Sequence, residues 1–378
     1  MAGRVASIDL VRGGIMALMA LDHARVFFFG LAPSPTDLGE SWPALFATRW
    51  VTHVCAPGFL LIAGMSAWLA GRGMTRGALA RYLALRGALL VALELTLVTF
   101  AWIPDPTRSF VLLQVIWAIG WSMIALAGLV LVLPGWAIGA LGAIGMAVHP
   151  LLGPEAFAAA GLPGWLHVVL LGSDTVTGPL GTTYIVSYAI LPWACVMAAG
   201  YGLAPVVLWA AAQRRRLLAG LGAVLLAGFG LLRAVTWGGG PDGIAPGIAL
   251  PAFLNLEKYP PAPLYLMVTL GLVLLALAAA EGWRASRAAR LHAALLSLGR
   301  APLFFYLAHL YLLRPVGLAL AVAVFGVDGV GPPPLPSSPQ WPLGAVYAVW
   351  LAALAALVPL TGWYAQRRGR IGAWGRYL

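Results

Sequence analysis

The sequence predicts an all-α polytopic membrane protein. Of its 378 residues, 61% are hydrophobic and only 9% are charged, whereas roughly a quarter of the residues in an ordinary soluble domain are charged. Apolar runs long enough to span a hydrocarbon core of ~30 Å recur from one end of the chain to the other, and short arginine clusters separate them. These observations predict one transmembrane domain over residues 1–378, with about ten crossings.

The basic clusters predict the orientation in the membrane. They lie at residues 72–86, 214–216, 284–300 and 367–376, after the second, sixth, eighth and tenth apolar runs. An even number of crossings with both termini inside places all of them in the cytoplasm, as the positive-inside rule requires. The net charge of +11 therefore indicates topology, and we expect lipids and no nucleic acid as partners. Cys55 and Cys195 lie in apolar runs without metal-type spacing, so neither a disulfide nor a metal site is expected.

Apolar length and Pro/Gly turns define the expected elements. We expect a re-entrant or interfacial piece at 153–182 and outer loops at 237–263 and 331–342. Gly58 and Gly64 indicate close helix packing. The expected helices span residues 9–31, 50–70, 84–103, 110–133, 135–152, 183–208, 217–236, 264–281, 302–324 and 343–364.

The first helix carries the most informative pair of residues. Arg12 and His23 are eleven positions apart, so at about 100° per residue they share one helix face, about 16 Å apart. With Arg12 at the cytoplasmic surface, His23 lies deep in the membrane, where ionisable groups are usually functional. A neutral imidazole there could act as a general base, or it could simply be hydrogen-bonded to a neighbouring helix. Asp22 could orient His23, or pair with Arg25 or with another helix.

Other polar residues complete the set of candidates. His53, at the start of the second helix, could line a vestibule with His23, although an interfacial histidine can also be unremarkable. His309 and Tyr306 form a second polar site inside a helix. For His309 a packing role is as compatible with the sequence as a catalytic role. Arg12, Arg76 and Arg81 could bind phosphate because the guanidinium matches its geometry, but topology alone also explains cytoplasmic arginines.

Two motifs resemble those of a known family. The first runs from Ser7 to Gly13 and continues with Leu21-Asp22-His23-Ala24-Arg25, and the second is Thr52-His53-Val54-Cys55-Ala56-Pro57-Gly58-Phe59. They resemble the heparan-α-glucosaminide N-acetyltransferase-like family of bacterial membrane proteins. The spacing of Arg12 and His23 also resembles the motif of the related acyltransferase-3 family. Residues 112–120 and 302–309 are similar in style to the family's later helices.

The resemblance implies an enzyme of the bacterial cytoplasmic membrane. It would move acetyl from cytosolic acetyl-CoA to an amino or hydroxyl group of an extracytoplasmic sugar or glycoconjugate. On this reading His23, Asp22 and His53 are catalytic, and the acyl-CoA ligands are Arg12, Arg76, Arg81, Tyr306 and His309. Animal members use a histidine in the loop after the first helix, and this chain has none between His23 and His53. A homodimer is compatible with the sequence.

Two other classes of function stay open at this point. A proton-coupled transporter or lipid flippase could use His23, Asp22 and His53 as a proton relay. The sequence shows no convincing internal repeat, which weakens the transporter interpretation without excluding it. A membrane scaffold without enzymatic activity is the third alternative.

Overall fold

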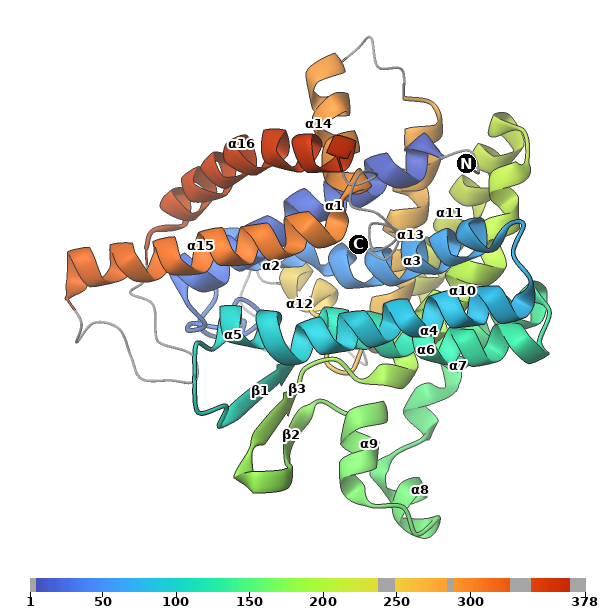
Figure 1. Ribbon diagram of the computed structural model, residues 1–378, viewed down its shortest axis with the longest axis horizontal. Helices are drawn as coiled ribbons and strands as arrows, with labels where there is room; N and C mark the ends of the chain where they lie inside the picture. The colour runs from blue at the N-terminus through green and yellow to red at the C-terminus, as the bar shows by residue number, and fades with distance from the viewer. Residues whose placement is uncertain (1–4, 237–248, 284–287, 327–340, 368–378) are drawn as a thin grey trace.

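The computed structural model describes residues 5–236, 249–283, 288–326 and 341–367, and these are mostly helical (Figure 1). The prediction of a helical membrane protein is confirmed, because eight helices in these ranges are long and apolar enough to cross a membrane. They are Pro43–Gly71, Arg76–Trp102, Val115–Val132, Ile190–Leu208, Ala211–Thr236, Pro263–Glu281, Pro302–Val324 and Leu343–Arg367. The remaining two expected crossings correspond to α1 (Ala6–Ala24), which carries several charged residues, and to the shorter α7 (Gly135–Val148). The count of ten stays a prediction.

The first part of the chain contains two wide turns. A π-helical turn, Arg25–Phe29, continues α1, and a second one, Glu94–Val98, joins α4 (Arg76–Leu93) to α5 (Thr99–Trp102). Between them, α2 (Pro43–Val51), a 3-10 turn (Thr52–Val54) and α3 (Cys55–Gly71) form one continuous helical run.

The predicted helix start at residue 84 is wrong. The Thr75 side chain accepts a hydrogen bond from the Ala78 amide at 3.2 Å and so caps α4 at its first turn. Arg76, Arg81 and Arg86, which the sequence placed with a basic loop, therefore lie on this helix.

A small sheet replaces two predicted helix starts. The strands β1 (Phe110–Leu113), β2 (Asp174–Thr177) and β3 (Thr183–Val186) are ordered β1-β3-β2, with β1 parallel and β2 antiparallel to β3. The predicted helices 110–133 and 183–208 are therefore wrong at their beginnings. The regular helices are α6 (Val115–Val132) and α10 (Ile190–Leu203), and a 3-10 turn (Ala204–Leu208) follows α10. Aromatic and β-branched residues in both short runs favour the extended backbone.

The segment predicted as re-entrant or interfacial projects from the bundle. It contains α8 (Pro154–Ala159) and α9 (Gly164–Leu170), in which no residue is buried, and it lies with the sheet below the long helices in Figure 1. This placement favours the interfacial alternative over the re-entrant one.

The second half adds α11 (Ala211–Thr236), α12 (Ala249–Leu254), α13 (Pro263–Glu281), α14 (Ala289–Arg300), α15 (Pro302–Phe325) and α16 (Leu343–Arg367). The sequence analysis did not predict α14. Several predicted features lie outside the described residues: Arg4, Arg284, Arg287, Arg368, Arg370 and Arg376, and residues 237–248 and 331–340 of the predicted outer loops.

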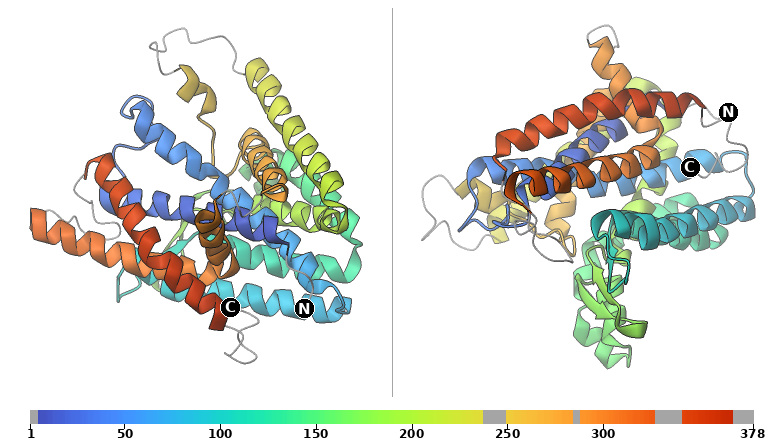
Figure 2. Two further views of the ribbon diagram at one scale, coloured as in Figure 1. Left: turned by 90° about the horizontal axis from the view of Figure 1, so that it is seen from above. Right: turned by 60° about the vertical axis from the view of Figure 1, so that its left-hand side comes forward.

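Helix α1 runs through the middle of the molecule (Figure 2) and contacts α3, α13, α14, α15 and α16. Its approach to α14 is close: a Cβ atom added to Gly13 would lie 1.9 Å from the carbonyl oxygen of Leu295. The predicted close packing at Gly58 and Gly64 is confirmed. A Cβ atom added to Gly64 would lie 2.0 Å from the carbonyl oxygen of Met197 on α10, and one at Gly58 would meet the Ile15 side chain at 2.4 Å.

Contacts at the two ends of α1 define two ends of the bundle. At the beginning of α1, the carboxylate of Glu281 binds both the Ser7 hydroxyl and the Arg214 guanidinium, which brings together three segments predicted to be cytoplasmic. At the other end of α1, Asp22 binds Arg49 on α2, the helix that precedes α3. The contacts agree with the predicted sidedness, and the orientation in the membrane stays a prediction.

Candidate active site

The most informative contact joins two histidines from opposite parts of the chain. His23 Nδ1 on α1 lies 2.6 Å from His309 Nε2 on α15. The two rings are inclined by only 12°, with centroids 4.9 Å apart, which is the arrangement of an in-plane N–H···N hydrogen bond. His309 is completely buried, whereas His23 is only partly buried. The sequence identified both residues but did not predict that they meet.

The hydrogen bonds define the tautomers of the neutral pair. His309 Nδ1 lies 3.0 Å from the carbonyl oxygen of Phe305, and because a carbonyl only accepts, Nδ1 carries the proton. His309 Nε2 then has a lone pair and accepts the hydrogen bond from His23 Nδ1–H. The Nε2 atom of His23 is left with a free lone pair. No side chain or carbonyl in the described ranges hydrogen-bonds this atom. It is also not one of the fully buried polar atoms that lack a hydrogen-bond partner.

Three aromatic side chains surround the His23 ring. The Trp102 ring meets His23 edge-on at a centroid distance of 5.0 Å, and the rings of Phe27 and Tyr306 lie at 6.3 Å and 6.4 Å. Trp102 and Tyr306 are almost completely buried. The predicted site residue Tyr306 is therefore brought to His23. The imidazole stands in largely apolar surroundings, where electrostatic interactions are stronger than in water.

Asp22 does not orient the imidazole. One carboxylate oxygen lies 2.6 Å from Arg49 Nη1 and the other lies 3.3 Å from Arg25 Nη2. Of the alternatives that the sequence left open, the structure shows pairing with Arg25 and with another helix. Arg49 extends the network, since its NH2 group also reaches the Tyr259 hydroxyl at 3.5 Å. Asp22 thus holds the C-terminal end of α1 against α2.

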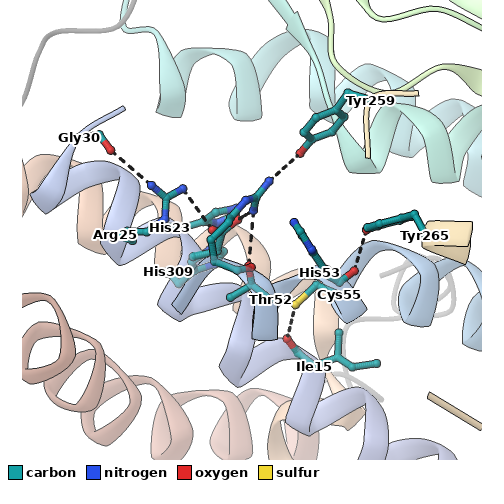
Figure 3. A network of polar contacts seen from close by, with 12 residues as sticks. Ile15, His23, Arg25, Gly30, Thr52, His53, Cys55, Tyr259, Tyr265 and His309 are labelled. Atoms are coloured by element: carbon teal, nitrogen blue, oxygen red, sulfur yellow. Dashed lines mark hydrogen bonds and ion pairs between the residues drawn. The ribbon is translucent and has the colours of Figure 1, made fainter. Parts of the chain in front are cut away.

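His53 lies in the same region but makes no contact with His23. It sits in the 3-10 turn before α3 and is 4% exposed, and its backbone carbonyl accepts a hydrogen bond from the Tyr265 hydroxyl at 2.8 Å. Figure 3 shows its imidazole between Tyr265 and the polar network at His23, with no contact drawn to either ring nitrogen. His53 and His23 therefore lie on neighbouring elements, and the vestibule that the sequence predicted between them stays a prediction.

Arg12 forms hydrogen bonds with residues of three helices. Its NH1 group donates to Asp9 Oδ1 and to the Gly299 carbonyl, both at 3.0 Å, and its NH2 group donates to the Ser66 hydroxyl at 2.6 Å. These partners belong to α1, α14 and α3. The contacts explain Arg12 structurally, and its predicted role in phosphate binding is untested.

Arg76 and Arg81 are not brought to the histidine pair. Both are exposed on α4, and Arg76 donates to the Leu131 carbonyl at 3.4 Å. The described structure therefore gathers His23, His309 and Tyr306 at one place, with Asp22 and His53 beside them, and leaves these two arginines apart.

Sequence reasoning missed four residues of this region: Arg49, Trp102, Lys258 and Tyr259. The signals were present but weak. Arg49 is the one arginine between the first helix and the second motif, and Lys258 is the sole lysine of the chain. The sequence does not predict which residues Arg49 and Lys258 contact, because those contacts depend on how the helices pack.

Comparison with known families identifies the family of the chain. The catalytic domain of heparan-alpha-glucosaminide N-acetyltransferase matches residues 4–226, which is more than half of the chain. The chain belongs to this family. No curated protein matches it closely enough to be reported.

The match makes the protein a member of a membrane acetyltransferase family. It includes His23, His53 and both motifs on which the resemblance was based, so the expected family is confirmed. The relation to the acyltransferase-3 family stays a prediction. The matched segment ends before α13, so His309, Tyr306 and Lys258 lie beyond it.

Proposed function

We propose that the protein transfers an acetyl group from acetyl-CoA to an amino or hydroxyl group of a sugar or glycoconjugate, across a bacterial cytoplasmic membrane. The observation that carries the proposal is the free lone pair on His23 Nε2. Because His23 donates from Nδ1 to His309, its Nε2 atom points away from His309. Membership of an acetyltransferase family supports the same class of reaction.

In the proposed reaction His23 is the general base. Nε2 takes the proton from the acceptor amine or hydroxyl as its nitrogen or oxygen attacks the thioester carbonyl carbon. The new C–N or C–O bond forms, the C–S bond breaks, and the CoA sulfur leaves with the electron pair. The proton held by His23 then neutralises the thiolate. His309 is a positioning residue, because it keeps the Nδ1 proton in place and so directs the basic nitrogen to the substrate.

The decisive experiment measures thiol release. Purified protein would be incubated with acetyl-CoA and amino sugars, and free CoA thiol would be quantified for the wild type and His23→Ala. We expect His23→Ala to lose about 10²- to 10⁴-fold in rate, the usual contribution of a positioned base. His167 on α9 provides a matched control, since it lies on the projecting segment and His167→Ala should keep the full rate.

Three results would change the proposal. Equal thiol release by the wild type and His23→Ala would remove His23 from the mechanism. Substrate uptake into proteoliposomes that is driven by a pH gradient, without any need for acyl-CoA, would favour the transporter alternative. Isolation of acetylated His23 after incubation with acetyl-CoA alone would make the imidazole a nucleophile rather than a base.

A further inference from the structure

The outer end of α1 holds more positive than negative charge. Arg25 and Arg49 both bind the single carboxylate of Asp22. Lys258 adds a third cation beside them and is only 7% exposed. Its ammonium group lies 4.9 Å from the ring centroid of Tyr259 and 5.7 Å from that of Tyr188. Within the described ranges Lys258 makes no ion pair, so three buried or half-buried cations share one carboxylate.

Lys258 is held rigidly although it lies in a loop. The end of α12 and the loop between α12 and α13 are fixed by hydrogen bonds to four neighbouring segments. The contacts are Arg233 Nε to the Phe253 carbonyl at 3.0 Å, Trp50 Nε1 to the Leu254 carbonyl at 3.2 Å, Asn255 Nδ2 to the Thr36 carbonyl at 2.9 Å, and His149 Nε2 to the Pro261 carbonyl at 3.1 Å. A cation that is built in at so many points is preorganised for a ligand.

Two ring faces and a hydrogen bond with the Tyr259 hydroxyl compensate this ammonium incompletely. Burying a charge without an ionic partner is unfavourable, and contact with ring faces offsets only part of that penalty. The neighbouring phenol responds to the excess charge. Burial acts to raise the pKa of Tyr259, but the positive charges of Lys258 and Arg49 outweigh it and lower the pKa to about 8. The surroundings of Lys258 therefore favour a negative charge.

The excess charge lies next to the proposed base. Asp22, which binds Arg49 at 2.6 Å, is adjacent to His23 in the chain. In Figure 3 the hydroxyl of Tyr259 points toward the polar network beside His23, and His53 borders the same region. The cytoplasmic donor is expected to enter at the end of α1 that carries Ser7 and lies near Arg214. The excess charge lies at the opposite end. An anion bound here would therefore belong to the acceptor and not to CoA.

Resting on the proposed function, we infer that Lys258 and Arg49 bind an oxyanion of the acyl acceptor, a carboxylate or a phosphate. The ammonium supplies up to three N–H donors, and charge-assisted hydrogen bonds to an oxyanion are among the strongest in proteins. The acceptor is then an acidic sugar or glycoconjugate, with its amino or hydroxyl group directed at His23.

Chemical labelling tests the site without any need for turnover. Lys258 is the sole lysine, so pyridoxal 5′-phosphate can form an imine, with loss of water, only there and at the N-terminal amine. Borohydride reduces the C=N bond, and mass spectrometry quantifies the two peptides. We expect inorganic phosphate or acetate to slow labelling of Lys258 about tenfold relative to chloride at equal ionic strength. The N-terminal amine is the internal control and should label equally in both salts. Equal labelling of Lys258 in phosphate, acetate and chloride overturns the site.

Acyl transfer identifies the source of the oxyanion. Glucosamine, glucosamine 6-phosphate and muramic acid, which carries a carboxylate, would be compared as acceptors. The wild type should show a KM about tenfold lower for the two acidic sugars, a preference that Lys258→Met loses and Lys258→Arg keeps. Equal use of all three sugars by the wild type overturns the inference but leaves the proposed function intact. Protection of Lys258 without any acyl transfer refutes the proposed function and leaves the anion site standing.

Membrane lipid is the other source of phosphate. Labelling would be repeated in nanodiscs of neutral lipid and in nanodiscs that contain an anionic phospholipid. Protection by the anionic lipid, together with a KM that does not depend on the sugar's charge, assigns the site to a headgroup and overturns the acceptor assignment. Protection by acidic sugars in neutral nanodiscs supports it.

Discussion

Replacing His309 tests the part of the mechanism that only the structure reveals. In His309→Leu the side chain still fills the space, but the Nδ1–H group of His23 loses its acceptor at 2.6 Å. A buried donor without a partner costs about 1–3 kcal/mol, and if this whole amount is lost from the transition state the rate falls about 5- to 150-fold. His309→Gln offers an amide oxygen in place of Nε2, so it should stay within about fivefold of the wild type.

The assay is thiol release from acetyl-CoA with an amino sugar acceptor, with thermal unfolding as a check on folding. Nitrogen-15 NMR of labelled histidine adds a readout that a purely structural role would not change, because the Nδ1–H tautomer of His23 should be lost in His309→Leu. A folded His309→Leu protein with full activity would refute the positioning role. A folded His309→Gln protein as inactive as His23→Ala would indicate that His309 itself takes part in the chemistry.

Three further predictions concern stability and ionisation. Gly13→Ala should destabilise the protein by about 1–3 kcal/mol, since the new methyl would overlap the Leu295 carbonyl, whereas Gly14→Ala, which meets nothing within 4 Å, should not lower the unfolding temperature. The folded-state pKa of Tyr259, about 8, lies below its ordinary value near 10, so the wild type should gain stability over Tyr259→Phe as pH rises from 8 to 10. Ultraviolet difference spectra of these two proteins should show phenolate appearing near pH 8. Glu94→Ala should cost about 1–3 kcal/mol by thermal unfolding, because the oxygens of the buried Glu94 carboxyl group accept backbone N–H groups at the start of α6.

The sequence was a good guide to what each helix contains and a poor guide to which helices meet. Hydropathy and the arginine clusters predicted a helical membrane protein, and helical periodicity together with depth in the membrane singled out His23. The partner of His23 lies 286 positions away, and no periodicity predicts which helix will pack against α1. Because the sequence does not show that His309 meets His23, the polar character of His309 alone predicts a role in cofactor binding.

Local ambiguity explains the errors in the elements. The runs at β1 and β3 are short and apolar, and a short apolar run fits a strand and a helix equally well. They were joined to the longer apolar helices that follow them. Arg12 shows a different limit. A cytoplasmic arginine suits phosphate as well as it suits a carbonyl and a hydroxyl, and only the packing of α14 and α3 shows that Gly299 and Ser66 occupy its donors.

The wide turn at Arg25–Phe29 begins two residues after His23. A π-turn has one residue more than the α-helical turn it replaces, so it is equivalent to a one-residue insertion. Deleting that residue would restore regular winding and rotate every later side chain of the helix by about 100° relative to the imidazole. A homologue without the insertion would thus present a different side chain where Phe27 stands here. The side chains that follow the turn, such as Phe27, can in this way differ between homologues while His23 keeps its position.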